Sequence, residues 1–328
     1  MLKGMFSTAA RPSLRWVTGG NLSRALLLVA VVVALLPAPW RSSGAPAQAA
    51  APARERIKAV KSYAIYYDGA KHLDNLAIRL APYDLAILNT NHLSEKETSV
   101  LKCSGKLLVS YLSVGEVDGG SPLLKTAQEK GWLLGGNKEW ESYYVNVTLE
   151  DWHSQMSAAA GDILKKGYDG VFLDTVDTVD LEDAAVPKEK LAEGMISLIH
   201  RLRAEHPEML IIQNRGFTVI SETAKDVDGV MYEDYSTGYS NTNKKYKPYN
   251  PDKIRSSKAR VNIMTELAKQ MPVLTLDYAR SGDTKTACAA TQAARRCGFI
   301  PAVSVGTLDD LLDYKLGQCP SVPGPCVP

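Results

Sequence analysis

The chain has 328 residues, a charged fraction of 23% and a formal net charge of +2, which are ordinary values for a globular protein. The first 49 residues hold five basic and no acidic side chains, so the remainder carries a net charge of 2 − 5 = −3. This balance excludes a strongly basic protein, and we expect no nucleic-acid partner.

Residues 1–49 have the pattern of an export signal. Four basic residues precede a 12-residue apolar run at 25–36, and small residues at 45–49 offer A-x-A cleavage sites. The run is short for a bilayer span. We therefore expect a secreted or periplasmic protein without stable membrane insertion, tethered to a membrane only if the signal stays uncleaved. We interpret residues 50–61 as a linker.

From residue 62 onward, short apolar strands alternate with amphipathic helices. A longer excursion after Glu116 contains Trp132, Trp140 and Tyr143, and we expect each of these three side chains to be part of its core. The expected strands are 62–67, 85–88, 106–114, 171–174, 210–213, 230–232, 273–276 and 299–303. The expected helices are 73–80, 94–102 (with a Ser94/Glu97 capping box), 150–166, 188–205, 222–226, 261–270, 287–296 and 308–316.

This alternation indicates an α/β protein with a parallel sheet. Eight strand–helix units in roughly 250 residues are typical of a (β/α)8 TIM barrel. A doubly wound open sheet is the alternative, but it would usually need a glycine-rich phosphate turn after the first strand. The sequence at 66–69, Tyr-Tyr-Asp-Gly, is not such a turn. We predict a single barrel domain at 62–317, followed by a Cys/Pro-rich tail at 318–328.

Carboxylates collect at the predicted strand ends. Asp174 follows the buried run Val-Phe-Leu, and Glu233 follows Val-Met-Tyr. The C-terminal ends of barrel strands share one rim, so this pair indicates acid/base chemistry there, although Asp174 could instead be only a cap. Aromatic rings and further polar groups on the rim suit a carbohydrate. The expected substrate-binding residues are Tyr67, Asp68, Tyr111, Glu116, Asp177, Asn214, Asp234 and Asp277.

Five motifs, in this order along the chain, resemble those of glycoside hydrolase family 114. They are Tyr-Asp-Leu at 83–85, Tyr-Leu-Ser-Val-Gly-Glu at 111–116, Lys-Gly-Tyr-Asp-Gly-Val-Phe-Leu-Asp-Thr-Val-Asp at 166–177, Asn-Arg-Gly at 214–216 and Tyr-Glu-Asp-Tyr at 232–235. The resemblance implies a (β/α)8 barrel that hydrolyses α-1,4-linked, partly deacetylated galactosamine polymers. It also implies a catalytic pair that maps onto Asp174 and Glu233.

Glycoside hydrolysis needs one carboxylic acid to protonate the leaving oxygen and a second carboxylate to attack or to activate water. By analogy with other barrel glycosidases, we expect Asp174 to be the nucleophile, Glu233 the acid/base, and the configuration to be retained. The other rim acids would bind the ammonium groups of a cationic polymer. We expect a monomer with no cofactor and no metal.

Two alternatives concern the same residues. A non-catalytic polysaccharide-binding barrel would not need both Asp174 and Glu233, so their presence argues against it. A Ca²⁺ site could use Asp174, Asp177 and Asp180, but their spacing differs from that of an EF-hand loop.

The five cysteines permit disulfides in an exported protein. Cys288 and Cys297 lie in one predicted helix, about 13 Å apart at a rise of about 1.5 Å per residue, which is too far for a bond between them. We expect at least one of Cys319 and Cys326 to be oxidised, either to the other or to Cys288 or Cys297. Cys103 should be a free, inert thiol.

Overall fold

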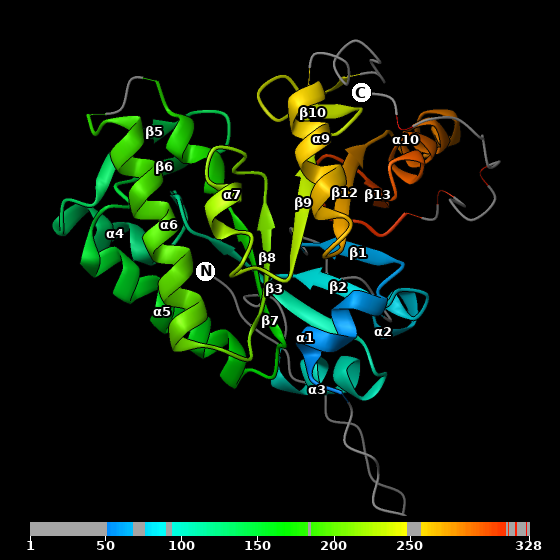
Figure 1. The fold of residues 1–328 in the computed structure, drawn as a ribbon, viewed down its shortest axis with the longest axis horizontal. Coiled ribbons are helices and arrows are strands. Elements are labelled where there is room, and N and C mark those ends of the chain that lie inside the picture. Colours follow the sequence, from blue (N-terminus) through cyan, green and yellow to red (C-terminus); the bar gives the residue numbers. More distant parts are fainter. Residues whose placement is uncertain are drawn as a thin grey trace, which may run out of the picture. The chain divides into compact units, whose positions relative to one another are not determined.

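Eight parallel strands form the centre of the protein in a computed structural model (Figure 1). Residues 1–49, expected to be an export signal, and Asp68 lie outside the described residues, so the expectations for them stay predictions. The structure describes residues 51–67, 76–89, 94–182, 185–247, 257–312, 314, 319 and 326.

The strands pair in the order β1-β2-β3-β7-β8-β9-β12-β13. Tyr67 N–H donates to Leu308 O at 2.8 Å, which joins the first strand to the chain beyond the last and brings the sheet close to a closed barrel. The (β/α)8 prediction is confirmed. The strands are β1 (Tyr63–Tyr66), β2 (Leu85–Leu88), β3 (Leu107–Ser113), β7 (Gly170–Asp174), β8 (Leu210–Asn214), β9 (Gly229–Glu233), β12 (Val273–Tyr278) and β13 (Ile300–Ser304).

Helices cover the outside of the barrel, and α5 and α6 lie side by side in Figure 1. The Ser94 capping box is confirmed. None of the helices among the described residues has the length and apolar character of a membrane span. The barrel helices are α2 (Leu76–Leu80), α3 (Glu95–Cys103), α5 (Glu150–Lys165), α6 (Lys188–Glu205), α7 (Ile220–Thr223), α9 (Lys258–Leu267) and α10 (Thr284–Arg296).

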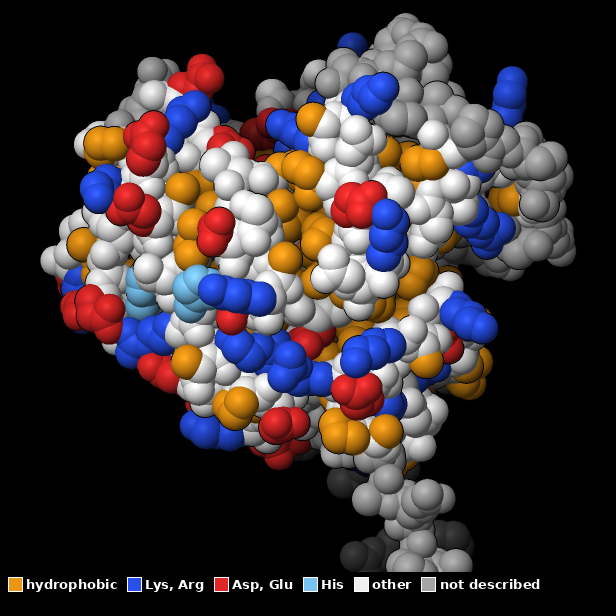
Figure 2. Space-filling model, viewed as in Figure 1, with side chains coloured by type: hydrophobic (Ala, Val, Ile, Leu, Met, Phe, Trp, Pro, Cys, Tyr) orange, Lys and Arg blue, Asp and Glu red, His pale blue; other side chains and the backbone are white. Residues whose placement is uncertain are grey.

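The strand side chains alternate between two apolar clusters. Val171 and Leu173 of β7 pack toward the helices, whereas Phe172 packs inside the barrel. Both faces are buried, which is why these strands read as continuous apolar runs rather than alternating ones. On the face seen in Figure 2, both acidic and basic side chains lie over α5, α6, α7 and α9.

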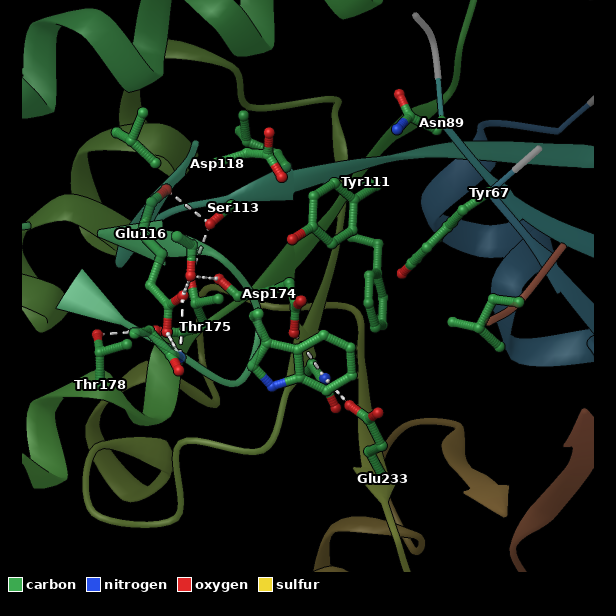
Figure 3. Close-up of a pocket in the computed structure, with 18 of the residues that line it drawn as sticks. Tyr67, Asn89, Tyr111, Ser113, Glu116, Asp118, Asp174, Thr175, Thr178 and Glu233 are labelled. Atoms are coloured by element: carbon green, nitrogen blue, oxygen red, sulfur yellow. Dashed lines mark hydrogen bonds between the residues drawn. The ribbon is translucent and has the colours of Figure 1, made fainter. Parts of the chain in front are cut away.

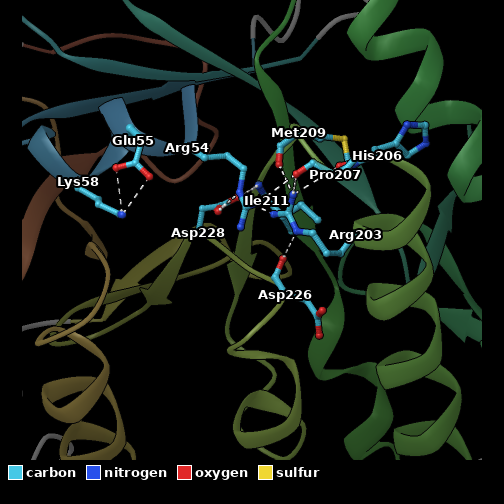
Figure 4. Close-up of polar contacts among 10 residues, drawn as sticks. All are labelled: Arg54, Glu55, Lys58, Arg203, His206, Pro207, Met209, Ile211, Asp226 and Asp228. Atoms are coloured by element: carbon cyan, nitrogen blue, oxygen red, sulfur yellow. Dashed lines mark hydrogen bonds and ion pairs between the residues drawn. The ribbon is translucent and has the colours of Figure 1, made fainter. Parts of the chain in front are cut away.

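The segment expected to be a linker is folded, so that prediction is wrong. Residues 53–59 form α1 (Ala53–Arg56) and a 3₁₀ turn (Ile57–Ala59), and Ile57 is 1% exposed within the barrel's inner cluster. Arg54 Nε donates to Asp228 Oδ1 at 2.8 Å, and Asp228 also binds Arg203 (Figure 4). The Ala- and Pro-rich composition of this segment gave no indication of these apolar and ionic contacts.

The excursion after β3 forms a small antiparallel sheet in the order β4-β6-β5, which the sequence did not predict. Trp132 is 3% exposed and its ring centroid lies 5.5 Å from that of Trp152, so its core position is confirmed. The core position expected for Trp140 is wrong, because its side chain is 49% exposed. Tyr143 is half-buried. The elements are β4 (Glu116–Asp118), α4 (Leu123–Glu129), β5 (Leu133–Asn137) and β6 (Ser142–Val145). A hairpin of β10 (Gly238–Ser240) and β11 (Lys245–Lys247) follows β9.

The helix expected at 308–316 is wrong, because residues 308–312 are not helical. Leu308 has a φ of 53°, which a right-handed helix does not allow. Leu308, Leu311 and Leu312 instead pack against the apolar clusters of the barrel without forming a helix. Tyr314 in this segment donates its hydroxyl to Ala279 O at 2.8 Å.

The tail cysteines bond back to the region of α10, as one of the expected alternatives. Cys288 pairs with Cys319 and Cys297 pairs with Cys326. Cys288 and Cys297 are not joined, and Cys103 is free, as expected. Cys103 is exposed, and its inertness stays a prediction.

Removing one bridge should destabilise the protein. Cys297 and Cys326 are 29 residues apart, and a loop of this size corresponds to about 3 kcal/mol of stabilisation. The double replacement of both cysteines by Ser should therefore lower the Tm by about 5–10 °C in thermal denaturation. Cys103→Ser is the matched control and should leave the Tm unchanged. Equal Tm values for all three proteins would show that the bridge does not stabilise the fold.

Candidate active site

The carboxylates of Asp174 and Glu233 come together at one end of the barrel. Asp174 ends β7, Glu233 ends β9, and Asn214 ends β8, which lies between them. Figure 3 shows Asp174 and Glu233 in the cleft at this end of the barrel. Asn214 Nδ2 donates to Asp174 Oδ1 at 2.8 Å and to Glu233 Oε2 at 2.7 Å. A single amide nitrogen therefore bridges the two acids.

These residues occupy equivalent positions in their strands. Along each strand every second side chain points into the barrel, and Phe172, Ile212 and Met231 are inward residues. The inward residues two positions further on are the last before the rim, and they are polar. For six of the strands, these end positions are Tyr67, Tyr111, Asp174, Asn214, Glu233 and Tyr278.

The environment raises the pKa of both acids. Burial, followed by repulsion from Glu233, raises the pKa of Asp174 to about 6. Burial also raises the pKa of Glu233, against the hydrogen bond that Tyr278 Oη donates to its Oε1 at 2.5 Å. Two interacting carboxyls titrate as a pair, so one proton is retained to higher pH than an isolated carboxyl would allow. Such a pair can supply both an acid and a base.

Two tyrosines, Tyr67 and Tyr111, also lie near the carboxylate of Asp174. Their rings meet edge to face with centroids 4.9 Å apart, and their hydroxyl ends point toward the carboxylates in Figure 3. Burial, reinforced by the charge of Asp174, raises the pKa of both phenols well above the usual value. Both hydroxyls therefore stay protonated and can act as hydrogen-bond donors.

Three further predicted residues line the same cleft, which has a volume of about 1600 Å³. Glu116 on β4 accepts hydrogen bonds from Ser142 and Asn137, and burial raises its pKa. Asp177 pairs with Arg215 at 3.1 Å between Oδ2 and Nη1. Asp234 is the third of these lining residues.

Asp277 does not belong to this set, and its prediction as a substrate-binding residue is corrected. Its side chain is buried, and Oδ1 accepts the backbone N–H groups of Ser236 and Thr237, both at 2.7 Å. Asp277 therefore fixes the turn after β9. In β12 the side chains of Leu274, Leu276 and Tyr278 point into the barrel, so Asp277, between two of them, points outward.

The three acids of the Ca²⁺ alternative, Asp174, Asp177 and Asp180, each have a different protein partner. Asp177 binds Arg215, and Asp180 accepts the hydroxyl of Thr218 at 2.6 Å. Among the residues that the structure describes, no group of three or more His, Cys, Asp or Glu side chains is arranged to hold a metal ion. The geometry does not support the Ca²⁺ alternative.

The model of the family described as "Glycoside-hydrolase family GH114" matches residues 44–320. The chain belongs to this family. It is a glycoside hydrolase, which confirms the resemblance seen in the motifs and leaves the non-catalytic barrel unsupported.

Solved structures agree with this assignment. The glycoside hydrolase domain of PelA from Pseudomonas aeruginosa is 26% identical, with 78% of this chain and 98% of that chain covered and a TM-score of 0.69. Ega3 from Aspergillus fumigatus, solved in complex with galactosamine, shares the fold at 15% identity, 79% and 96% coverage and a TM-score of 0.62. An uncharacterised protein of Deinococcus radiodurans is 22% identical over 295 residues, which are 84% of this chain and 92% of that protein.

In this GH114 enzyme, Asp174, Asn214 and Glu233 are each followed directly by a residue whose backbone adopts the left-handed conformation. The φ angle is 62° at Thr175, 52° at Arg215 and 55° at Asp234. A β-branched residue such as Thr175 rarely adopts this conformation, and such backbone outliers cluster at functional sites. The sequence signal was weak, because no glycine marks these positions.

The Thr175 hydroxyl forms hydrogen bonds that connect the end of β7, at Asp174, to the end of β3 and the segment after it. Its Oγ1 accepts the N–H of Gly115 at 2.8 Å, lies 3.0 Å from Ser113 Oγ, and donates to Asp174 O at 2.6 Å. A Cβ at Gly115 would lie only 2.3 Å from Thr175 O and 2.1 Å from Thr178 Oγ1, so this close approach requires glycine. Thr175 and Arg215 are the positioning residues that the sequence did not reveal.

Removing the Thr175 hydroxyl should misplace Asp174. We expect Thr175→Val to lower kcat about 10-fold and to change KM less, because the hydroxyl is engaged by the protein. The pH profile of kcat should also shift, since the surroundings of Asp174 change. Thr175→Ser keeps the hydroxyl and should behave like the unmodified enzyme. Equal losses in both variants would show that the methyl group, not the hydroxyl, matters.

Proposed function

We propose that this GH114 enzyme is a secreted monomer that cleaves internal α-1,4 bonds of partly deacetylated galactosamine polymers with retention of configuration. The proposal rests on one observation above all, the amide-bridged pair of Asp174 and Glu233 at the bottom of an acidic cleft. Secretion rests on the signal pattern of residues 1–49.

The separation of the two acids supports retention. Since Asn214 Nδ2 lies 2.8 Å from Asp174 Oδ1 and 2.7 Å from Glu233 Oε2, these two oxygens are at most the sum of those distances, 5.5 Å, apart. Retaining glycosidases hold their carboxyls about 5–5.5 Å apart, whereas inverting enzymes need about 6.5–9.5 Å to admit a water.

Each acid then has a defined role. Asp174 attacks the anomeric carbon while Glu233 donates its proton to the leaving glycosidic oxygen, which gives a covalent glycosyl-enzyme. Glu233 then takes a proton from water, which attacks the same carbon and releases Asp174. Asn214 stabilises negative charge on both carboxylates in turn, and Tyr278 orients Glu233.

The charge of the cleft suits a cationic polymer. Arg215, Lys166 and Lys247 are its basic lining residues, and Arg215 is paired with Asp177. Acids are more numerous, and ammonium groups on deacetylated sugars would pair with them. The galactosamine in the Ega3 structure is a sugar of this class. The acidic lining residues include Glu116, Asp118, Glu139, Asp174, Asp177, Asp180, Glu182, Glu233, Asp234 and Asp309.

Azide rescue tests the roles and the stereochemistry together. With Asp174→Ala, azide occupies the place of the nucleophile and should yield a β-glycosyl azide from an α-linked, activated galactosaminide. With Glu233→Ala, azide attacks the covalent intermediate and should yield the α-glycosyl azide. Proton NMR distinguishes the two anomers. Exchange of these outcomes would reverse the roles, and release of β-configured sugar by the unmodified enzyme would contradict retention.

A further inference from the structure

Two surface hairpins meet above the catalytic cleft. Asn241, in the turn between β10 and β11, donates through Nδ2 to Glu139 O at 2.8 Å. Ser240 Oγ donates to Glu139 Oε1 at 3.3 Å. Glu139 lies in the turn between β5 and β6, about a hundred residues earlier in the chain. We call these two segments, residues 138–141 and 239–244, the bridge.

The bridge crosses the mouth of the barrel. One half belongs to the excursion after β3 and the other to the excursion after β9. In the strand order, β7 and β8 separate β3 from β9 on one side, and β12, β13, β1 and β2 separate them on the other. The two hairpins therefore start from nearly opposite strands and meet across the mouth of the barrel.

The cleft continues on both sides of the bridge. Asp180 and Glu182, after β7, line it on one side, while Asn89 and Asp309, after β2 and β13, line it on the other. Residues of both halves of the bridge, including Glu139 and Asn241, also line the cleft. Among the residues that the structure describes, the cleft therefore extends to both sides of the bridge, with Asp174 and Glu233 in its lining.

Each half of the bridge also carries an aromatic ring that lines the cleft. Trp140 is 49% exposed, next to Glu139. Tyr239 is fixed in place, since its ring centroid lies 5.0 Å from that of Tyr246 and a Cβ at Gly306 would lie 2.2 Å from the ring. Flat aromatic faces are suited to stacking on sugar rings.

We propose that the bridge closes over a bound polysaccharide chain, so that the enzyme makes several cuts before it releases the chain. The inference rests on the proposed polymer substrate. The bridge consists of hydrogen bonds between partly exposed groups, which water can replace, so the hairpins can part to admit the middle of a chain. Once they close again, the chain can slide along the cleft but cannot leave sideways.

The first test weakens the bridge without touching the catalytic pair. The double replacement Ser240→Ala with Asn241→Ala should reduce the number of cuts per encounter at least about 3-fold, because an unbridged chain dissociates faster. This number follows from the ratio of short soluble products to new ends in the remaining polymer. Turnover of a galactosamine tetrasaccharide should stay unchanged. Thr242→Ala, in the same exposed turn, is the matched control.

The second test locks the bridge. Lys138→Cys with Thr242→Cys, in a Cys103→Ser background, allows a bismaleimide to join the two hairpins through exposed residues outside the cleft lining. The joined enzyme should lose most cleavage of long polymer and keep cleavage of the tetrasaccharide. Unchanged cuts per encounter in the Ala variant, or full polymer cleavage by the joined enzyme, would overturn the bridge proposal alone. Failure of the unmodified enzyme to cleave any galactosamine polymer would overturn the substrate proposal and this one with it.

Discussion

Asp174→Asn and Glu233→Gln should each lower polymer hydrolysis by about 10³-fold or more while leaving the protein folded, because each removes a proton-transfer or nucleophilic role that the reaction requires. Both replacements keep the size of the side chain. Asn214 can still donate to the new amide oxygens, so the geometry of the site should persist. Initial rates on galactosamine polymer, with circular dichroism as a check of folding, measure the effect.

Asp180→Asn is the matched control for this loss. Asp180 lies on the same rim and lines the same cleft, but it accepts the Thr218 hydroxyl and has no contact with the pair. Its replacement should change the rate less than about 3-fold, in line with a peripheral contact. Near-normal activity of Asp174→Asn or Glu233→Gln would remove that residue from the mechanism.

Asp174→Asn should also make the protein more stable at neutral pH. The pKa of Asp174 is raised from the ordinary 3.8 to about 6, so keeping it ionised opposes folding. The shift corresponds to about 3 kcal/mol, and since Asp174 is partly open to the cleft we expect about 2 kcal/mol. Urea denaturation of both proteins at pH 7.5 measures the difference.

The pH dependence of this gain follows from the direction of the shift. Below about pH 4 Asp174 is protonated in both the folded and the unfolded chain, so the variant should have no advantage there. The unmodified protein should lose stability relative to the variant as the pH rises from about 4 to about 6, and the gap should then stay constant. Asp177→Asn, which breaks an ion pair with Arg215, should show no such gain. A variant that is less stable than the unmodified protein at pH 7.5 would contradict the raised pKa.

The strands and the rim positions of Asp174 and Glu233 could be predicted because both depend on local sequence. A short apolar run that ends in a carboxylate identifies a buried parallel strand and its rim residue without knowledge of the neighbours. Alternation refines this further, since Asp174, Asn214 and Glu233 each stand two positions after an inward apolar residue. The same rule applied to β12 would have selected Tyr278 instead of Asp277.

Other features depend on contacts between distant segments and have no local signal. The bridge joins Glu139 to Asn241, and the anchor of α1 joins Arg54 to Asp228. The composition of residues 50–61 resembled a linker because, among the described residues of this segment, the fully buried hydrophobic side chains are just Ile57 and Val60. The helix expected at 308–316 failed because apolar spacing does not reveal that Leu308 adopts a positive φ.

Digestion of a defined polymer tests the central claim most directly. Purified enzyme is incubated with α-1,4-linked galactosamine polymer in a partly deacetylated and a fully N-acetylated form, and the products are identified by mass spectrometry. We predict galactosamine oligosaccharides from the deacetylated polymer, slower cleavage of the acetylated form, and no products from an Asp174→Asn/Glu233→Gln double variant. The absence of products from the unmodified enzyme, or equal product yields from the double variant, would contradict the proposed function.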